Sequence, residues 1–151
     1  MERLDESVGY LLSRVRSTMW NGMTQQTLAE LQITATQASI VMMLASGRSP
    51  VAAELARECG LDASSVTRLI DRLERHGLLT RIRSDADRRM VRLALTVKGA
   101  RVAAKIPPIF SRVMDSLFDG FTPEEIGFLK SMLRRVLANS DCLVAADQLM
   151  E

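Results

Sequence analysis

The stretch that decides the fold is ELARECGLDASSVTRLIDRLERHGLLTRIRSDADRRMVRLALT, residues 54–96. In its first part, apolar residues recur every three or four positions, which is the spacing of amphipathic helices. In its last part, apolar and polar residues alternate, which is the spacing of half-buried strands. The stretch therefore predicts two helices followed by two strands.

The two predicted helices are separated by a very short turn. Gly60 suits a left-handed C-terminal cap of the first helix, and Asp62 offers an N-cap for the second, with only Leu61 between them. Two helices joined by so short a turn containing glycine are typical of a helix-turn-helix. The second helix should end at Gly77, and its core stripe is Val66, Leu69, Ile70 and Leu73.

The alternating part predicts a β-hairpin. Leu78, Thr80 and Ile82 share one face of the first strand, and Arg81 and Arg83 share the other. A loop of roughly five residues follows, and the second strand alternates Val91, Leu93 and Leu95 with more polar positions. A basic ribbon directly after a helix-turn-helix is the pattern of a wing.

Helical patterns continue on the N-terminal side. Residues from about 4 to 29 have apolar positions spaced by threes and fours, which predicts a long amphipathic helix. Thr34 and Gln37 then form a capping-box pattern at the start of another helix. Because this next helix is apolar nearly all round, we expect it to lie at the centre of the fold.

Two more helices are expected on the C-terminal side. Helical periodicity runs from Val97 to about Asp119, through the kink-prone pair at 107–108. The last helix should begin at Thr122, with Glu125 closing a capping box, and the polar run at 139–141 is a candidate interruption. The predicted fold class is therefore mainly α, with six helices and a small β-hairpin wing.

Charge is distributed unevenly along the chain. The 151 residues carry a net charge of +2, but the segment from Arg48 to Arg101 holds twelve Lys/Arg against seven acidic residues. Arginine outnumbers lysine 17 to 3, and its planar fork suits phosphates and base edges. All the aromatic residues lie outside this segment. The chain therefore has a basic centre that is flanked by more apolar arms, and the arginine-rich centre is suited to binding nucleic acid.

The chain shows no feature of a secreted or membrane protein. Its N-terminus has no apolar core of a secretory signal, and its longest uninterrupted apolar run, Ile40 to Ala45, is far shorter than a membrane span. Cys59 and Cys142 do not make a disulfide framework. We therefore expect a cytoplasmic protein without membrane contact.

The polar face of the second helix in the opening stretch carries the candidate DNA contacts. Short hydroxyl residues near the start of a helix, followed by arginine, suit a helix whose N-terminal end enters the major groove. Arg68 is long enough for bidentate contact with guanine, and the hydroxyls can serve phosphates or base edges. The alternative is an ordinary solvated helix face. The candidates on this helix are Ser64, Ser65, Thr67, Arg68 and Arg72.

The tip of the predicted wing, SDADRR at residues 84–89, combines two acidic and two basic residues. A carboxylate beside an arginine can hold the guanidinium in one rotamer through a charge-assisted hydrogen bond. We therefore expect Asp87 to orient Arg89 toward a narrow minor groove, where arginine is favoured. The alternative is that the acids only form the turn. The wing candidates are Arg83, Asp87, Arg88 and Arg89.

These motifs resemble the MarR family of winged helix-turn-helix transcriptional regulators. The run VTRLIDRLERHGLL, residues 66–79, is similar to the family's recognition helix. The spacing Asp87-x-Arg89-x5-Leu95-Thr96-x-x-Gly99 matches its wing motif, in which the aspartate positions the arginine that enters the minor groove.

The resemblance implies an architecture. Residues 1–33 would be an N-terminal dimerisation helix, residues 34–100 the winged helix-turn-helix domain, and residues 101–151 the C-terminal dimerisation helices. A homodimer would place two recognition helices about one DNA turn apart on a pseudo-palindromic operator. The expected function is a repressor of transcription that binds double-stranded DNA.

The resemblance also implies release from DNA by a small aromatic or phenolic effector, often an acid. Such a ligand would bind between the dimer helices and the winged domain, in a pocket with apolar walls and a few polar groups. For each candidate residue, an ordinary place in the core is the alternative. The candidates are Tyr10, Arg14, Trp20, Met42 and Met43.

Other chemistries find less support in the sequence. It has none of the common catalytic or nucleotide-binding motifs, and its single histidine, His76, leaves no histidine pair for acid–base work or metal binding. We expect no enzyme, no metal and no cofactor. A redox-sensing regulator of the same fold is the alternative function, but the chain lacks a cysteine near the start of the first helix, and a reactive role for Cys142 is left open.

Overall fold

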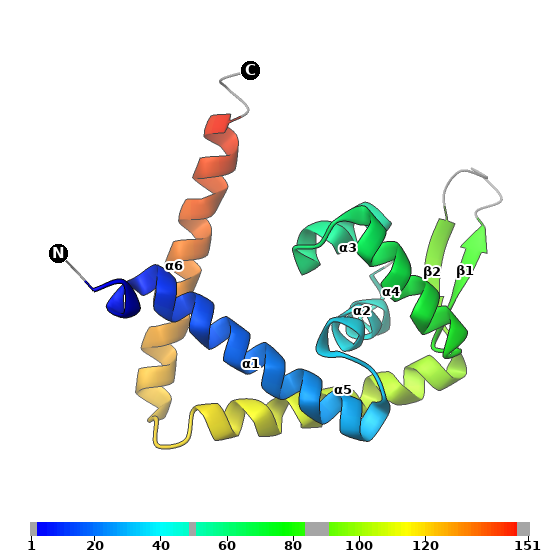
Figure 1. Cartoon of the computed structure of the whole chain (residues 1–151), viewed down its shortest axis with the longest axis horizontal. Coiled ribbons are helices and arrows are strands. Elements are labelled where there is room, and N and C mark those ends of the chain that lie inside the picture. The colour runs from blue at the N-terminus through cyan, green and yellow to red at the C-terminus, as the bar shows by residue number, and fades with distance from the viewer. Residues whose placement is uncertain (1–2, 49–50, 84–90, 148–151) are drawn as a thin grey trace. The chain divides into compact units, whose positions relative to one another are not determined.

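The computed structural model describes residues 3–48, 51–83 and 91–147, except for the side chains of Leu4 and of residues 140–147 (Figure 1). The chain forms two compact units, Met1–Leu117 and Phe118–Glu151. Its elements in order are η1 (Leu4–Glu6), α1 (Val8–Leu31), α2 (Ala35–Ala45), α3 (Ala52–Cys59), α4 (Ala63–Arg75), β1 (Leu79–Arg83), β2 (Val91–Leu95), α5 (Val97–Leu117) and α6 (Pro123–Asp147).

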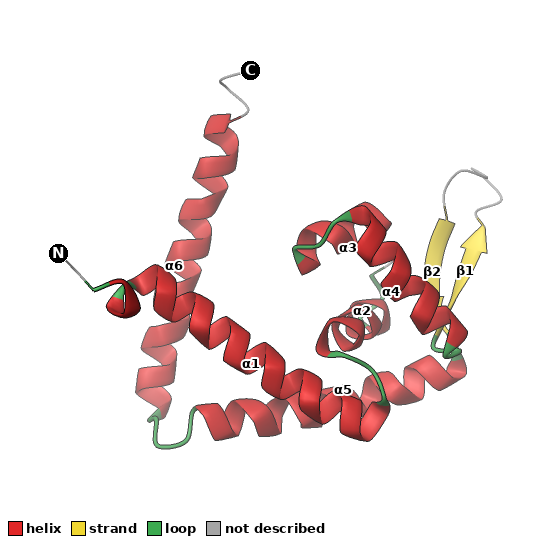
Figure 2. Ribbon diagram, in the orientation of Figure 1, coloured by secondary structure: helices red, strands yellow, loops and turns green. Residues whose placement is uncertain are grey.

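The predicted winged helix-turn-helix is confirmed. Helices α3 and α4 follow one another across a turn of three residues, and β1 and β2 pair antiparallel directly after α4 (Figure 2). The register runs from the pair Leu79 and Leu95 to the pair Arg83 and Val91. The fold class expected from the sequence, six helices with a small hairpin wing, is therefore the observed one.

The helix boundaries follow the predicted caps. The amide of Gln37 donates to Thr34 Oγ1 at 3.2 Å while the amide of Thr34 donates to Gln37 Oε1 at 2.9 Å, a complete capping box for α2. Gly60 has a left-handed φ of 64° where α3 ends. Asp62 then accepts from the amide of Ser65 at 2.8 Å and starts α4. These local signals fix the turn between the two helices.

The core of the first unit is built around α2, as its all-round apolar sequence predicted. Ile40 and Val41 are fully buried, and so is Ile33 just before the helix. The surrounding elements each contribute apolar side chains, so α4 is held on a packed base rather than on a flexible arm. Fully buried residues from these elements include Leu55, Val66, Leu73, Leu79, Ile106 and Ile109.

The hairpin packs through one face. Leu79 and Leu93 are buried, whereas Ile82, which points to the other face, is 50% exposed. Because strand side chains alternate, Arg81 shares the inward-facing side of β1 with Leu79. A charged residue on the packed face requires compensation, and the acids on α4 supply it, as described below.

A close contact joins the wing to α5. Thr96 Oγ1 donates to the carbonyl oxygen of Gly77 at 2.5 Å and accepts from the amide of Gly99 at 3.0 Å. The amide of Thr96 donates to the carbonyl oxygen of Leu78 at 3.1 Å. One threonine therefore caps the start of α5 and closes the root of the hairpin.

The N-terminal helix is shifted toward the C-terminus relative to the prediction of about residues 4 to 29, because α1 runs from Val8 to Leu31. A single 3-10 turn, η1, precedes it, and Ser7 caps α1 through the amide of Tyr10 at 3.3 Å. Helix α1 is tied to the start of α2 because Trp20 Nε1 donates to Thr36 Oγ1 at 3.2 Å and the amide of Ala35 donates to Thr24 Oγ1 at 3.2 Å.

The second unit consists mainly of α6. Thr122 and Glu125 form the predicted capping box, with distances of 2.8 and 3.2 Å. The expected interruption at 139–141 is wrong: α6 is unbroken from Pro123 to Asp147, since weak helix formers inside a long helix lower its stability without ending it. Several large apolar side chains of α6 are exposed within the chain: Phe128, Met132, Leu133, Val136 and Leu137.

Among the described residues, no single helix combines the length and the apolarity that crossing a membrane requires. Helices α1 and α2 meet both requirements only when they are taken together, and the pair is bent by 76°.

Candidate DNA-binding surface

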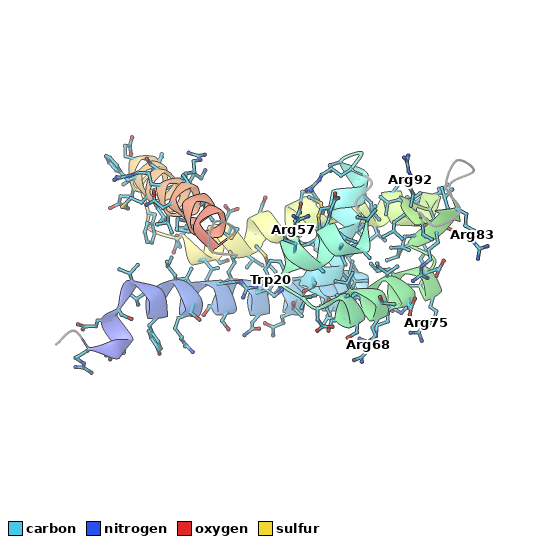
Figure 3. All side chains as sticks on the ribbon, turned by 90° about the horizontal axis from the view of Figure 1, so that it is seen from above. Trp20, Arg57, Arg68, Arg75, Arg83 and Arg92 are labelled. Carbon is cyan, nitrogen blue, oxygen red and sulfur yellow. The ribbon has the colours of Figure 1, made fainter. Side chains whose placement is uncertain are left out.

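Helix α4 presents most of the predicted DNA contacts to solvent. Ser64, Thr67, Arg68 and Arg72 are exposed and Ser65 is half-buried. Figure 3 shows Arg68 projecting from α4 on the same side as Arg75. The buried residues of this helix, which include Val66, Ile70 and Leu73, face the core instead. The amphipathic pattern therefore sorts the helix into a packed face and a free cationic face.

The hydroxyl groups at the start of α4 are already engaged within the helix. Ser64 Oγ donates to Asp62 Oδ1 at 2.5 Å, Ser65 Oγ donates to Asp62 Oδ2 at 2.8 Å, and Thr67 Oγ1 donates to the carbonyl oxygen of Ala63 at 2.9 Å. The hydrogen bonds from Ser64 and Ser65 hold the pKa of the Asp62 carboxyl far below its usual range. The negative charge of Asp62 repels a phosphate at the start of α4. The hydroxyl oxygens of Ser64, Ser65 and Thr67 still have lone pairs that can accept hydrogen bonds from the amino groups of bases.

The arginines of α4 supply the complementary positive charge. Within the described residues, neither Arg68 nor Arg72 forms an ion pair, so both guanidiniums are free to bind an anion or a base edge. Arg75 Nε makes only a long contact, 3.4 Å, to the carbonyl oxygen of Asp71. Exposed arginines on one helix face that form no ion pair with the described residues are suited to a polyanion.

Arg81 is an arginine that sequence reasoning missed. Its Nη2 lies 2.6 Å from Asp71 Oδ1 and its Nη1 is paired with Glu74 Oε2. The hydrogen bond to Asp71 is the main reason why the pKa of Arg81 is raised. The sequence held only part of the signal: Asp71 and Glu74 are three residues apart and share a helix face, but their contact with Arg81 depends on how the hairpin packs.

The wing residues lie partly within the description. Arg83 is exposed at the end of β1, opposite Val91 on β2. Figure 3 shows Arg83 pointing away from the body of the molecule. Three further wing candidates, Asp87, Arg88 and Arg89, lie outside the described residues.

A cleft lies beside α4. It has a volume of about 400 Å³ and combines the Trp20 ring with two of the candidate DNA contacts, Arg68 and Arg72. Apolar walls with a few polar groups are typical of small-molecule sites. The residues that line it are Trp20, Thr24, Thr34, Thr36, Leu61, Ser65, Arg68, Leu69 and Arg72.

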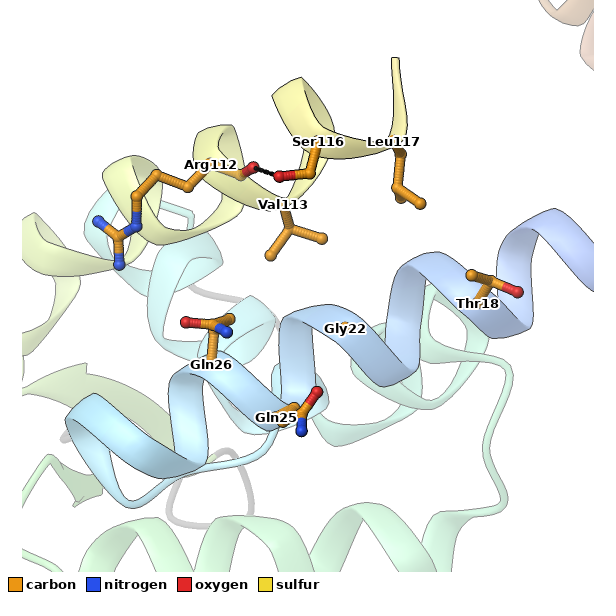
Figure 4. Close-up of a pocket in the computed structure, with 8 residues that line it drawn as sticks. All are labelled: Thr18, Gly22, Gln25, Gln26, Arg112, Val113, Ser116 and Leu117. Carbon is orange, nitrogen blue, oxygen red and sulfur yellow. Dashed lines mark hydrogen bonds between the residues drawn. The ribbon is translucent and has the colours of Figure 1, made fainter. Parts of the chain in front are cut away.

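A second cleft of about 410 Å³ lies between α1 and α5 (Figure 4). Gly22 brings α1 close to α5 there, since a β-carbon on it would stand 3.2 Å from Val113 Cγ1. Arg112 at its rim is paired with Glu30 of α1. The lining residues are Thr18, Gly22, Gln25, Gln26, Arg112, Val113, Ser116 and Leu117.

The structure separates the five ligand candidates. Trp20 lines the cleft beside α4. Met42 and Met43 are half-buried and pack against the core of the first unit. Tyr10 and Arg14 are exposed on α1, and neither lines a cleft described above. The geometry therefore brings one candidate, Trp20, to a cavity that it shares with the exposed residues Arg68 and Arg72.

Metal and thiol chemistry find no site among the described residues. No group of three or more His, Cys, Asp or Glu residues is placed to hold a metal ion in this part of the chain. Burial raises the pKa of the half-buried Cys59 thiol, which lowers its thiolate fraction and its reactivity. The side chain of Cys142 is outside the described set.

Comparisons with known proteins agree with this geometry. Residues 33–91 match the family model described as MarR family. The chain is 35% identical over 82 residues to the uncharacterized HTH-type transcriptional regulator YsmB of Bacillus subtilis (strain 168). This alignment covers 54% of the chain and 56% of YsmB. The chain thus matches little more than half the length of that relative.

Solved structures resemble nearly the whole chain. The transcriptional repressor CouR bound to a 23-mer DNA duplex has a TM-score of 0.78 and 29% identity, covering 89% of this chain and 94% of CouR. Bordetella bronchiseptica BpsR, whose DNA binding is regulated by 6-hydroxynicotinic acid, has a TM-score of 0.75 and 26% identity, covering 90% of this chain and 96% of BpsR. Residues 33–91 therefore match the MarR family of transcriptional regulators, and nearly the whole chain shares its fold with these solved structures.

Proposed function

We propose that this protein is a sequence-specific repressor that binds double-stranded DNA through α4 and the β1–β2 wing. The observation that carries the proposal is that Arg68 and Arg72 are exposed and form no ion pair among the described residues, on a helix that is attached to an adjacent basic hairpin. Arginine at both a recognition helix and a wing suits a duplex, because the helix reads the major groove while the wing reaches the backbone or the adjacent minor groove.

We further propose that the protein acts as a homodimer. Phe128, Met132 and Val136 are spaced by four residues on α6 and are 71%, 54% and 52% exposed, so they form an apolar stripe along one face. An exposed apolar stripe of this kind favours association. A two-fold dimer with recognition helices about 34–36 Å apart would require a pseudo-palindromic operator.

The proposed effector is a small aromatic or phenolic acid that binds the cleft beside α4. Trp20 offers a ring for stacking, and Arg68 and Arg72 offer positive charge for a carboxylate. An acid held there would engage the same guanidiniums that the DNA needs. Ligand and operator would then compete for Arg68 and Arg72, and binding of the ligand would release the DNA.

A gel shift on the DNA that flanks the protein's own gene tests this function. The expected result is a shifted band that persists when a scrambled duplex of the same length is added as competitor. Aromatic acids that bind the protein should release the DNA and remove this band. The matched amides of those acids should fail, because they lack the carboxylate. Trp20 is the only tryptophan, so its fluorescence reports ligand binding separately. Absence of any shift would reject the repressor function, and release by the amides would reject the proposed charge recognition.

A further inference from the structure

We propose that Arg81 is a positioning residue that fixes the wing against α4, so that the recognition helix and the wing bind DNA as one rigid unit. This inference rests on the proposed DNA-binding function. Arg81 differs from the proposed DNA contacts, because its guanidinium is paired with Asp71 and Glu74 of α4 and is not offered to the duplex.

The contact is a two-point attachment. Nη2 of Arg81 lies 2.6 Å from Asp71 Oδ1, and Nη1 binds Glu74 Oε2. Asp71 and Glu74 are one helical turn apart, so the planar fork of Arg81 spans a full turn of α4. A single point charge could pivot about its partner, whereas two hydrogen bonds to two carboxylates restrict rotation. The side chain of Arg81 is only 33% exposed, which limits screening by solvent.

The position of Arg81 along the hairpin gives the attachment its effect. The other polar contacts to the end of α4 lie at the root of the wing, where Thr96 Oγ1 binds the carbonyl oxygen of Gly77 and Lys98 Nζ binds that of His76 at 2.8 Å. Arg81 is in the middle of β1, opposite the buried Leu93. The buried Leu79 and Leu93 hold the hairpin on the core, and the mid-strand contact of Arg81 adds a directional link to α4 that the polar contacts at the root do not supply.

The same contact also controls the charge of the helix face. Asp71 and Glu74 lie on α4 among Arg68, Arg72 and Arg75. If Arg81 were absent, these two carboxylates would be left with the free arginines as their nearest cations on the helix. They would then hold guanidiniums that the DNA requires. By pairing with Asp71 and Glu74, Arg81 therefore leaves the arginines of α4 available to bind DNA.

The experiment measures DNA binding by fluorescence anisotropy with two duplexes, the operator and the same operator with G·C base pairs in its A·T-rich flanks. The wild-type chain should prefer the A·T flanks, where the wing reads the minor groove. Arg81→Met should bind the A·T-flanked duplex about tenfold more weakly, since a partly buried ion pair is lost. Its affinity for the G·C-flanked duplex should change much less.

Two further variants separate positioning from other effects. Asp71→Asn with Glu74→Gln removes two negative charges beside the DNA, so a purely electrostatic effect predicts tighter binding, whereas positioning predicts the same loss of flank preference as Arg81→Met. Arg48→Met is the matched control, because it breaks a bidentate pair with Glu58 that does not involve the wing. It should keep the flank preference.

The outcomes are distinguishable from failure of the proposed function. A wild-type chain that binds no duplex overturns the DNA-binding proposal itself. A wild-type chain that binds but shows no flank preference, or an Arg81→Met variant that retains the preference, overturns the positioning role and leaves DNA binding intact. Thermal unfolding is recorded for every variant. If Arg81→Met is unfolded, the Asp71→Asn, Glu74→Gln chain decides.

Discussion

Gly99 at the start of α5 lies directly against the carbonyl oxygen of Leu78: a β-carbon on Gly99 would stand 1.9 Å from that oxygen. Leu78 is buried at the root of the wing and its carbonyl accepts from the amide of Thr96. The approach of these two backbones is what allows the hairpin to run straight into α5, so the glycine of the wing motif is required by space rather than by its φ angle.

Gly99→Ala should therefore destabilise the protein. The added methyl group would overlap backbone that cannot move without breaking the contact of Thr96, and overpacking of this kind costs about 3 kcal/mol. Denaturant unfolding measures the change. The control is Gly127→Ala in α6, where nothing lies within 4 Å of the added carbon; it should raise stability by about 0.5–1 kcal/mol through helix propensity. Equal effects at the two positions would contradict the close contact.

Arg68→Ala should relax base preference at one position of each half-site. If its guanidinium binds a guanine in bidentate fashion, the loss is about 1–3 kcal/mol of discrimination. Binding to a library of operator variants measures it. Lys105→Ala on α5 removes the same charge away from α4 and should weaken all sequences alike, if at all. A uniform loss with Arg68→Ala would show that it contacts phosphate instead.

At the wing tip, the direction of the change in DNA affinity distinguishes an orienting role of Asp87 from simple charge repulsion. Arg89→Ala should weaken binding mainly on operators with A·T-rich flanks. Asp87→Ala should partly reproduce that loss although it removes a negative charge, because Arg89 would lose its orienting partner. Affinity for the A·T-flanked operator measures both variants. Tighter binding by Asp87→Ala would show that the carboxylate acts only through repulsion.

The apolar stripe of α6 should be part of the dimer interface. Met132→Lys places a charge in the middle of the stripe, and burying an unpaired charge is costly, so the dimer should dissociate at least tenfold more readily. Sedimentation equilibrium measures the dissociation constant. Ser131→Lys adds the same charge at an exposed neighbour outside the stripe and should have little effect. A dimer indifferent to Met132→Lys would place its interface elsewhere.

Local signals in the sequence predicted the elements well. The capping boxes at Thr34 and Thr122, and the caps at Gly60 and Asp62, depend on residues within a few positions of one another, so they can be recognised without tertiary structure. The prediction of an interruption at 139–141 was wrong because it also rested on local residue preferences alone. A local preference for turns was too weak to end a long helix.

Contacts between distant segments were not predictable in the same way. The pairing of Arg81 with Asp71 joins residues ten positions apart whose meeting depends on how the wing folds back over α4. The cleft that brings Trp20 near Arg68 requires α1 to cross beside the recognition helix. Spacing along the chain identified these residues as exposed or apolar, but only packing determines which of them meet.

The most direct measurement of the central claim is the salt dependence of binding to the operator DNA. If α4 and the wing of both protomers hold six to ten phosphates, affinity should fall by about 10³–10⁵ between 50 and 200 mM salt. The logarithm of the binding constant should fall linearly with the logarithm of the salt concentration. An affinity that is flat over this range, or an absence of binding to duplex DNA at the lowest salt, would contradict the account.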